Sequence, residues 1–141
     1  MKKNRTAFTM VELVFVIVVL GILAAIAVPR LAATRDDAQI TKGISDVAAI
    51  RSAIVSERQQ RMLRGETGFV GSLGNDFTGP DANHRLLMYP VKTGSDNGEW
   101  SSSDGLTFTY KVMNESNTFT YNPADGTFTC TSGNYCDQLA E

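Results

Sequence analysis

An apolar segment near the start of the chain limits its fold more than any other feature. From Phe8 to Val28, Glu12 is the only ionisable residue. At about 1.5 Å per residue this segment forms a helix of about 31 Å, long enough to cross the hydrocarbon core of a membrane. A charged group at the bilayer centre costs about 2.5–3.5 kcal/mol. The sequence therefore predicts a membrane-spanning helix in which Glu12 needs a specific role.

The charges that flank the segment are asymmetric. Lys2, Lys3 and Arg5 precede it, whereas the charges just beyond it balance one another: Arg30, Arg35, Asp36 and Asp37. Positive charge is retained on the cytoplasmic side of membrane helices. We therefore expect a cytoplasmic N-terminus and a C-terminal region on the outer side of the membrane.

A conventional secretory signal peptide is the first alternative. A basic start, an apolar stretch and a small-residue cleavage site at Ala25-Ile26-Ala27 are all present. Cleavage after Ala27 would release a secreted binding module that begins at Val28. This alternative leaves Glu12 unexplained, because a charge only weakens the apolar stretch of a signal peptide.

The second alternative is a resemblance to a known family. A short basic leader, followed by Phe8 and by a Glu at the fifth position of "FTMVELVFVIVVLGILAAIAVPR", resembles the N-terminus of type IV pilins and type II secretion pseudopilins. The resemblance implies that a membrane peptidase cleaves between Ala7 and Phe8 and methylates the new amine. The family commonly has Gly before the cut, where this chain has Ala7. Gly21 and Pro29 match the family's helix-loosening Gly and Pro.

The resemblance also implies a role for Glu12 in assembly. Cleavage gives Phe8 a free amine, with which Glu12 can pair inside its own subunit or, as the family mechanism has it, in a neighbouring subunit. Pairing relieves the cost of an isolated charge in a medium of low dielectric. Phe8, Glu12, Gly21 and Pro29 are therefore the expected assembly residues.

The same resemblance implies the partners and the location. The expected partners are copies of this chain and other pilins or pseudopilins in a helical filament, the prepilin peptidase, an inner-membrane assembly platform and membrane lipid. We expect a structural subunit and not an enzyme, first anchored in the inner membrane and then part of a periplasmic or extracellular filament. A secretion pseudopilus, a type IV pilus and a DNA-uptake filament remain open.

Beyond Pro29 the sequence predicts a second, amphipathic part of the same helix, ending near Gly65. Apolar residues recur at helical spacing and predict a packed face: Ile40, Ile44, Val47, Ile54 and Val55. Gly21 and Pro29 predict that the helix kinks or unwinds between Ile22 and Val28. The charged residues are expected on the opposite face: Arg35, Asp36, Lys42, Asp46, Arg51, Glu57 and Arg61.

Arg58, Arg61 and Arg64 recur every three residues at the end of this helix. They fit either a contact with nucleic acid or a protein partner, or a solvated helix end at which cations favour the helix dipole. The acidic surroundings and the net charge of −2 favour the second interpretation. No specific nucleic-acid partner is therefore predicted.

The C-terminal half has the alternation typical of β-strands. Segments 106–112, 118–122 and 127–131 each alternate threonine or another polar residue with larger inward-facing residues, and Leu86–Val91 is a candidate fourth strand. The glycine-rich segment 65–85 is expected to be a surface loop. We predict an α+β fold, with a long N-terminal helix packed on a small antiparallel β-meander. Its parts are a leader (1–7), a transmembrane assembly helix (8–29), an amphipathic helix (30–64) and a loop with a β-region (65–141).

Cys130 and Cys136 are close in sequence near the C-terminus. This spacing predicts a disulfide rather than two free thiols, given the outward topology. His84 is the only histidine, and no catalytic, metal-binding or cofactor-binding pattern is present. The acidic turns at Asp96–Glu99 and at Asp104 keep calcium binding open, but no metal or cofactor is predicted.

Overall fold

The computed structural model describes residues 8–79 and 86–140. The described chain begins with helix α1 (Met10–Leu63), which is followed by four strands and by the short helix α2 (Cys136–Leu139). Backbone contacts divide the chain into two units, Met1–Arg35 and Asp36–Glu141. The predicted leader, residues 1–7, lies outside the described residues.

Helix α1 runs without a break through the position at which we expected an interruption. Pro29 lies inside the helix, and every residue from Ile22 to Val28 is helical. The expected unwinding is therefore wrong. Proline removes one backbone hydrogen bond and crowds the carbonyl of Ala25, but the bonds of the neighbouring residues remain.

The end of α1 is set by a Schellman motif at the predicted glycine. The Glu66 N–H donates to the Arg61 carbonyl at 2.9 Å, and the Gly65 N–H donates to the Met62 carbonyl at 3.0 Å. Gly65 has a φ of 86°, which a residue without Cβ adopts at little cost. The prediction that the helix ends near Gly65 is confirmed.

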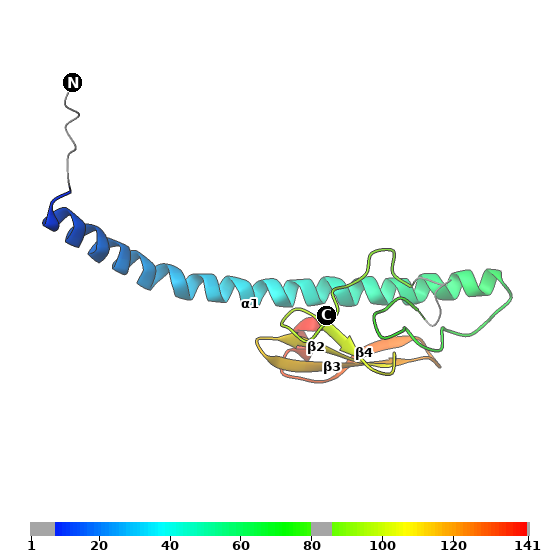
Figure 1. The fold of residues 1–141 in the computed structure, drawn as a ribbon. Coiled ribbons are helices and arrows are strands. Elements are labelled where there is room, and N and C mark those ends of the chain that lie inside the picture. The colour runs from blue at the N-terminus through cyan, green and yellow to red at the C-terminus, as the bar shows by residue number, and fades with distance from the viewer. Residues whose placement is uncertain (1–7, 80–85, 141) are drawn as a thin grey trace, which may run out of the picture. The chain divides into compact units, whose positions relative to one another are not determined.

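A four-stranded antiparallel sheet follows in the order β1-β2-β3-β4. The strands are β1 (Trp100–Ser102), β2 (Thr107–Val112), β3 (Glu115–Asn122) and β4 (Thr127–Ser132). Figure 1 shows the last part of α1 lying along one face of this sheet. This arrangement confirms the predicted α+β fold and three of its strands.

The fourth predicted strand is wrong. Residues 86–91 form bends and irregular backbone, and Trp100–Ser102 is the strand that pairs with β2. Pro90 cannot donate a ladder hydrogen bond, and Met88 and Tyr89 are both 82% exposed. The apolar residues of this segment indicated a buried strand that does not form.

The core of the unit Asp36–Glu141 lies between the part of α1 that belongs to this unit and the inner face of the sheet. Trp100 is fully buried, and its ring lies within 6.0 Å of the rings of Phe77, Tyr110, Phe119 and Phe128, measured between centroids. From α1 the core receives Val47, Ile50 and Ile54.

The glycine-rich segment is more than a surface loop. Val70, Leu73 and Phe77 are at most 2% exposed and belong to the core. The Tyr121 hydroxyl donates to the Val70 carbonyl at 2.7 Å, and burial raises the pKa of Tyr121 to about 12. The expected surface loop spans 65–85, of which residues 80–85 lie outside the described residues; in the described part three apolar side chains among the glycines anchor the loop to the core.

Gly43 allows α1 to approach the sheet closely. A Cβ at this position would lie 2.5 Å from both Leu139 Cδ2 and Tyr110 Cε1. The Tyr110 hydroxyl donates to the Gln39 carbonyl one turn earlier, at 2.7 Å. Any side chain at residue 43 would therefore push α1 away from the sheet and from α2.

The predicted faces of the amphipathic helix need correction. The Lys42 ammonium pairs with Asp46 at 2.7 Å, and the Trp100 indole N–H donates to Asp46 at 2.9 Å. Arg51 donates to the carbonyls of Phe128 and Ala140. These charged side chains therefore contact the folded C-terminal region instead of lying opposite to it.

Two apolar residues were also assigned to the wrong face. Ile44 and Val55 are 37% and 52% exposed, although they share helical spacing with buried residues. The solvent-facing residues of α1 between Thr41 and Ser56 carry no charge: Thr41, Ile44, Ser45, Ala48, Ala49, Ser52, Val55 and Ser56. The packed face is narrower than the sequence indicated.

The predicted disulfide is confirmed. Cys130 in β4 is bonded to Cys136 at the start of α2, with Cα atoms 5.4 Å apart. The Tyr135 N–H donates to the buried side chain of Asn117 at 2.9 Å. The bond and this contact hold α2 so that Leu139 enters the core.

Candidate functional site

The apolar part of α1 exposes its large side chains. Its described large apolar side chains, from Phe8 to Leu31, range in exposure from 36% for Val19 to 85% for Phe8. Helix α1 is long and apolar enough to cross a membrane. A continuous apolar surface of this size marks a membrane or an association site. The segment is therefore the candidate functional site.

Thr9 and Glu12 form a capping box at the start of this helix. The N–H and the hydroxyl of Thr9 donate to Glu12 Oε2 at 2.9 Å and 2.8 Å, and the Glu12 N–H returns a bond to the Thr9 hydroxyl at 3.2 Å. This reciprocal arrangement satisfies backbone donors that the first turn of a helix leaves without partners.

The role of Thr9 was missed in the sequence. The pattern Thr-x-x-Glu before an apolar run is a known signal for a helix start, so the information was present. Both donors of Thr9 bind Oε2 of Glu12, so a further donor would bind Oε1 of the same carboxylate. The pairing of Glu12 with the Phe8 amine requires leader removal and stays a prediction.

Gly21 and Pro29 lie within the same helix. A Cβ at Gly21 would meet no atom within 4 Å, so packing inside the chain does not require a glycine there. Pro29 occupies an interior helical position, at which it costs about 3 kcal/mol relative to alanine. Both residues therefore have no evident benefit to the isolated subunit.

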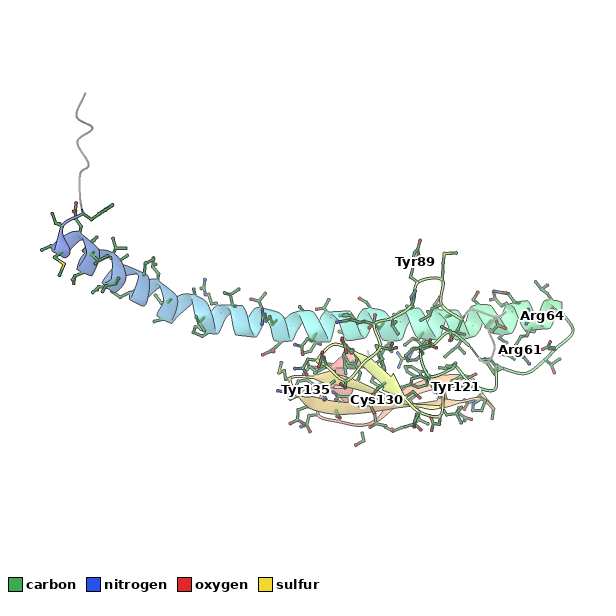
Figure 2. The ribbon with its side chains drawn as sticks, viewed as in Figure 1. Arg61, Arg64, Tyr89, Tyr121, Cys130 and Tyr135 are labelled. Carbon is green, nitrogen blue, oxygen red and sulfur yellow. A yellow bond between two sulfur atoms is a disulfide. The ribbon has the colours of Figure 1, made fainter. Side chains whose placement is uncertain are left out.

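The three arginines at the end of α1 are used inside the chain. The Arg58 guanidinium lies over the ring of Phe69, 4.3 Å from its centroid. Arg61 pairs with Glu66 at 2.7 Å, and Arg64 pairs with Glu57 at 3.2 Å. Figure 2 shows Arg61 and Arg64 at this end of the helix. These contacts support the interpretation as a helix end rather than a ligand-binding row.

The acidic turns also use their carboxylates locally. Asp104 accepts the N–H groups of Thr107 and Leu106, which lower its pKa. Glu99 pairs with the Lys92 ammonium, which lowers the pKa of the Glu99 carboxyl. Within residues 8–79 and 86–140, no three His, Cys, Asp or Glu side chains gather as a metal site.

Comparison with known proteins identifies the N-terminal segment. Residues 2–28 match the model of the prokaryotic N-terminal methylation motif. This match supports the resemblance of the N-terminal part of the chain to pilins and pseudopilins. The long helix followed by an antiparallel sheet is consistent with a pilin-like α+β fold.

Several curated proteins are similar to part of this chain. The type II secretion system core protein G of Aeromonas hydrophila is 40% identical over 53 residues, which are 38% of this chain and 37% of that protein. The corresponding protein of Vibrio cholerae is 41% identical over 56 residues, 38% of each chain. A fimbrial protein of Pseudomonas aeruginosa is 39% identical over 54 residues, 38% of this chain and 35% of that protein.

The similarity to these proteins covers less than two fifths of this chain. The aligned segments span less than two fifths of the length of these relatives. No solved structure matches the chain. The likeness that can be placed on the chain is the motif match over residues 2–28, which include the capping box and the apolar segment up to Val28.

Proposed function

We propose that this chain is a structural subunit of a type II secretion pseudopilus or of a type IV pilus-like filament. The single observation that carries the proposal is the uncovered apolar part of α1, which begins at a polar capping box. In the monomer only lipid can cover this surface. In a filament the same surface is covered by the helices of other subunits.

Processing is the first step of the proposed function. The prepilin peptidase cuts between Ala7 and Phe8 and methylates the new amine. Thr9 becomes the second residue and keeps its backbone N–H, so the capping box with Glu12 survives the cut. The methylation motif over residues 2–28 supports this step.

Glu12 then provides the register between subunits. Thr9 holds one carboxylate oxygen of Glu12 and fixes the direction of the side chain. The Phe8 amine of a neighbouring subunit pairs with the other oxygen. Two opposite charges in a medium of low dielectric attract each other strongly, so the position at which they meet sets the axial offset.

Gly21 and Pro29 weaken the helix only where neighbouring subunits pack. A position without Cβ lets two helices approach closely. Proline leaves one helix carbonyl without its backbone donor, and neighbouring helices can satisfy that carbonyl. Their lack of benefit to the isolated chain supports a role in assembly.

A signal peptide cleaved after Ala27 is less compatible with the fold. Ala25 and Ala27 both lie in the interior of α1, which continues to Leu63. Cleavage there would divide one continuous helix. The secreted binding module is therefore not favoured.

The proposed location follows from the anchor. The subunit spans the inner membrane with its N-terminus in the cytoplasm and its sheet in the periplasm, and the disulfide fits that compartment. An assembly platform then transfers subunits from lipid into the filament.

The test is the recovery of filaments. Cells that produce the chain together with a prepilin peptidase and an assembly system should yield sheared material that contains the chain, visible by electron microscopy as thin fibres. The control is the same system without the peptidase, in which the chain should remain in the membrane. Complete retention in the membrane of the full system would contradict the proposal.

A further inference from the structure

Among the described residues of the unit Asp36–Glu141, the large exposed apolar side chains lie in two places. Among its described residues, the large ones lie on α1 and on one loop tip, and none lies on the four strands. On α1 they are Ile44, Val55, Met62 and Leu63. The loop tip consists of Met88 and Tyr89, which are both 82% exposed.

The loop tip is a protruding feature. Figure 2 shows Tyr89 at the end of a loop that passes beyond α1, on the side away from the sheet. Pro90 restricts the backbone of Tyr89 to extended conformations, which reduces the entropy lost when the tip is bound. The ring of Tyr89 therefore presents apolar area and a hydroxyl that its own chain does not cover.

A hollow lies between α1 and the edge strand β4. Its volume is about 290 Å³, and it is lined by Arg51, Val55 and residues 126–129. The Arg51 guanidinium is fixed there by the Phe128 carbonyl at 3.2 Å and the Ala140 carbonyl at 3.1 Å. The hollow thus combines an apolar wall with a cation held in place.

The tip offers an aromatic ring and the hollow a guanidinium, and the two do not meet within one chain. Tyr89 is largely exposed and is not among the residues that line the hollow. An aromatic ring is attracted to a guanidinium placed over its face. A protruding patch and a pocket at different places on one molecule form a head-to-tail contact, which can repeat without closing.

We propose that the Met88–Tyr89 tip of one copy of this chain inserts into the hollow between α1 and β4 of the next copy. This inference rests on the proposed filament and adds a contact outside the apolar helix. The occupant is a second copy, because the chain carries both complementary parts and a filament needs an open, directional contact. Tyr89 is the anchor, and Met88 and Val55 form the apolar surroundings.

Cross-linking between two kinds of subunit tests the contact. One full-length chain carries Met88→Cys, which leaves Tyr89 in place, and the other carries Val55→Cys. Both are produced in the same cells, and a short bismaleimide is added. We expect a cross-linked dimer only when both variants are present, because the contact is directional.

Two controls make the result specific. Met88→Cys paired with Thr107→Cys, on the exposed outer face of the sheet, should give no dimer above background. Adding Tyr89→Ser to the Met88→Cys chain should lower the dimer yield about tenfold, the size typical of truncating an interface tyrosine. Tyr89→Phe should keep most of the yield, because the ring remains.

The outcomes separate this contact from the proposed function. Filaments that form without the Met88–Val55 cross-link would overturn the contact and leave the filament role intact. A cross-link in membranes that never yield filaments would support the contact and contradict the filament role. Equal dimer yields for Tyr89→Ser and the parent tip would also overturn it.

Discussion

Replacement of Glu12 by leucine should abolish filament assembly while the subunit still accumulates in the membrane. The substitution makes the apolar segment more hydrophobic, so insertion should not suffer. What is lost is the carboxylate that pairs with the Phe8 amine of a neighbouring subunit. We expect normal membrane levels of cleaved subunit and little or no sheared filament, measured by quantitative immunoblotting of both fractions.

Glu12→Gln is the matched control that the capping box makes available. Glutamine can accept from Thr9 as glutamate does, so the helix start is kept while the charge is removed. If the charge sets the register, Glu12→Gln should fail as Glu12→Leu does. Assembly by Glu12→Gln would assign the role to the helix cap instead. Accumulation of uncleaved Glu12→Leu would place Glu12 in peptidase recognition.

Replacement of Trp100 by alanine should destabilise the C-terminal unit by about 3–5 kcal/mol, the usual cost of removing a large buried aromatic side chain. Trp100 is fully buried among four other aromatic rings, and its indole N–H donates to Asp46 on α1. The loss is a large part of the total stability of an ordinary domain. Pulse proteolysis of the full-length chain in detergent and urea measures it.

Trp100→Phe separates the two contributions. Phenylalanine fills most of the space but leaves Asp46 without the indole donor, so we expect a cost of about 1–3 kcal/mol. Lys42 still pairs with Asp46 in this variant. A loss for Trp100→Ala no larger than that for Trp100→Phe would contradict the central position of Trp100 in the core.

The sequence predicted the strands wherever the alternation was regular. Phe108, Tyr110, Phe119, Tyr121 and Phe128 all face the core, as the spacing indicated. Side chains of a strand alternate between its two faces every second residue, so this pattern can be recognised without knowledge of tertiary contacts.

Features that depend on distant contacts were not predictable in this way. Helical spacing places Val55 beside Ile54, but the sheet covers only a narrow part of α1, and Val55 stays exposed. The charged Lys42 and Asp46 appeared solvent-facing, because nothing local indicates that Trp100 and the Gly98 carbonyl meet them. The anchoring of the glycine-rich loop likewise depends on the core formed by the later strands.

The candidate site also combines features that a local pattern indicates with features that depend on distant contacts. Phe8, Glu12, Gly21 and Pro29 were recognisable because a short linear pattern carries them. The Thr9 cap is equally local, because Thr-x-x-Glu before an apolar run is itself a short pattern. The exposed tip at Tyr89 and the hollow beside Val55 exist only in the folded chain, so no local sequence pattern indicates them.

The mass of the membrane-extracted chain tests the central claim most directly. Intact-mass analysis, with tandem fragmentation of the N-terminus, should find a chain that begins at Phe8, carries one methyl group on its amine and keeps the whole apolar helix. The same chain produced without a prepilin peptidase should keep its leader. A mature species that begins at Val28 would contradict the account, because it would lack both Glu12 and the helix through which the subunits assemble.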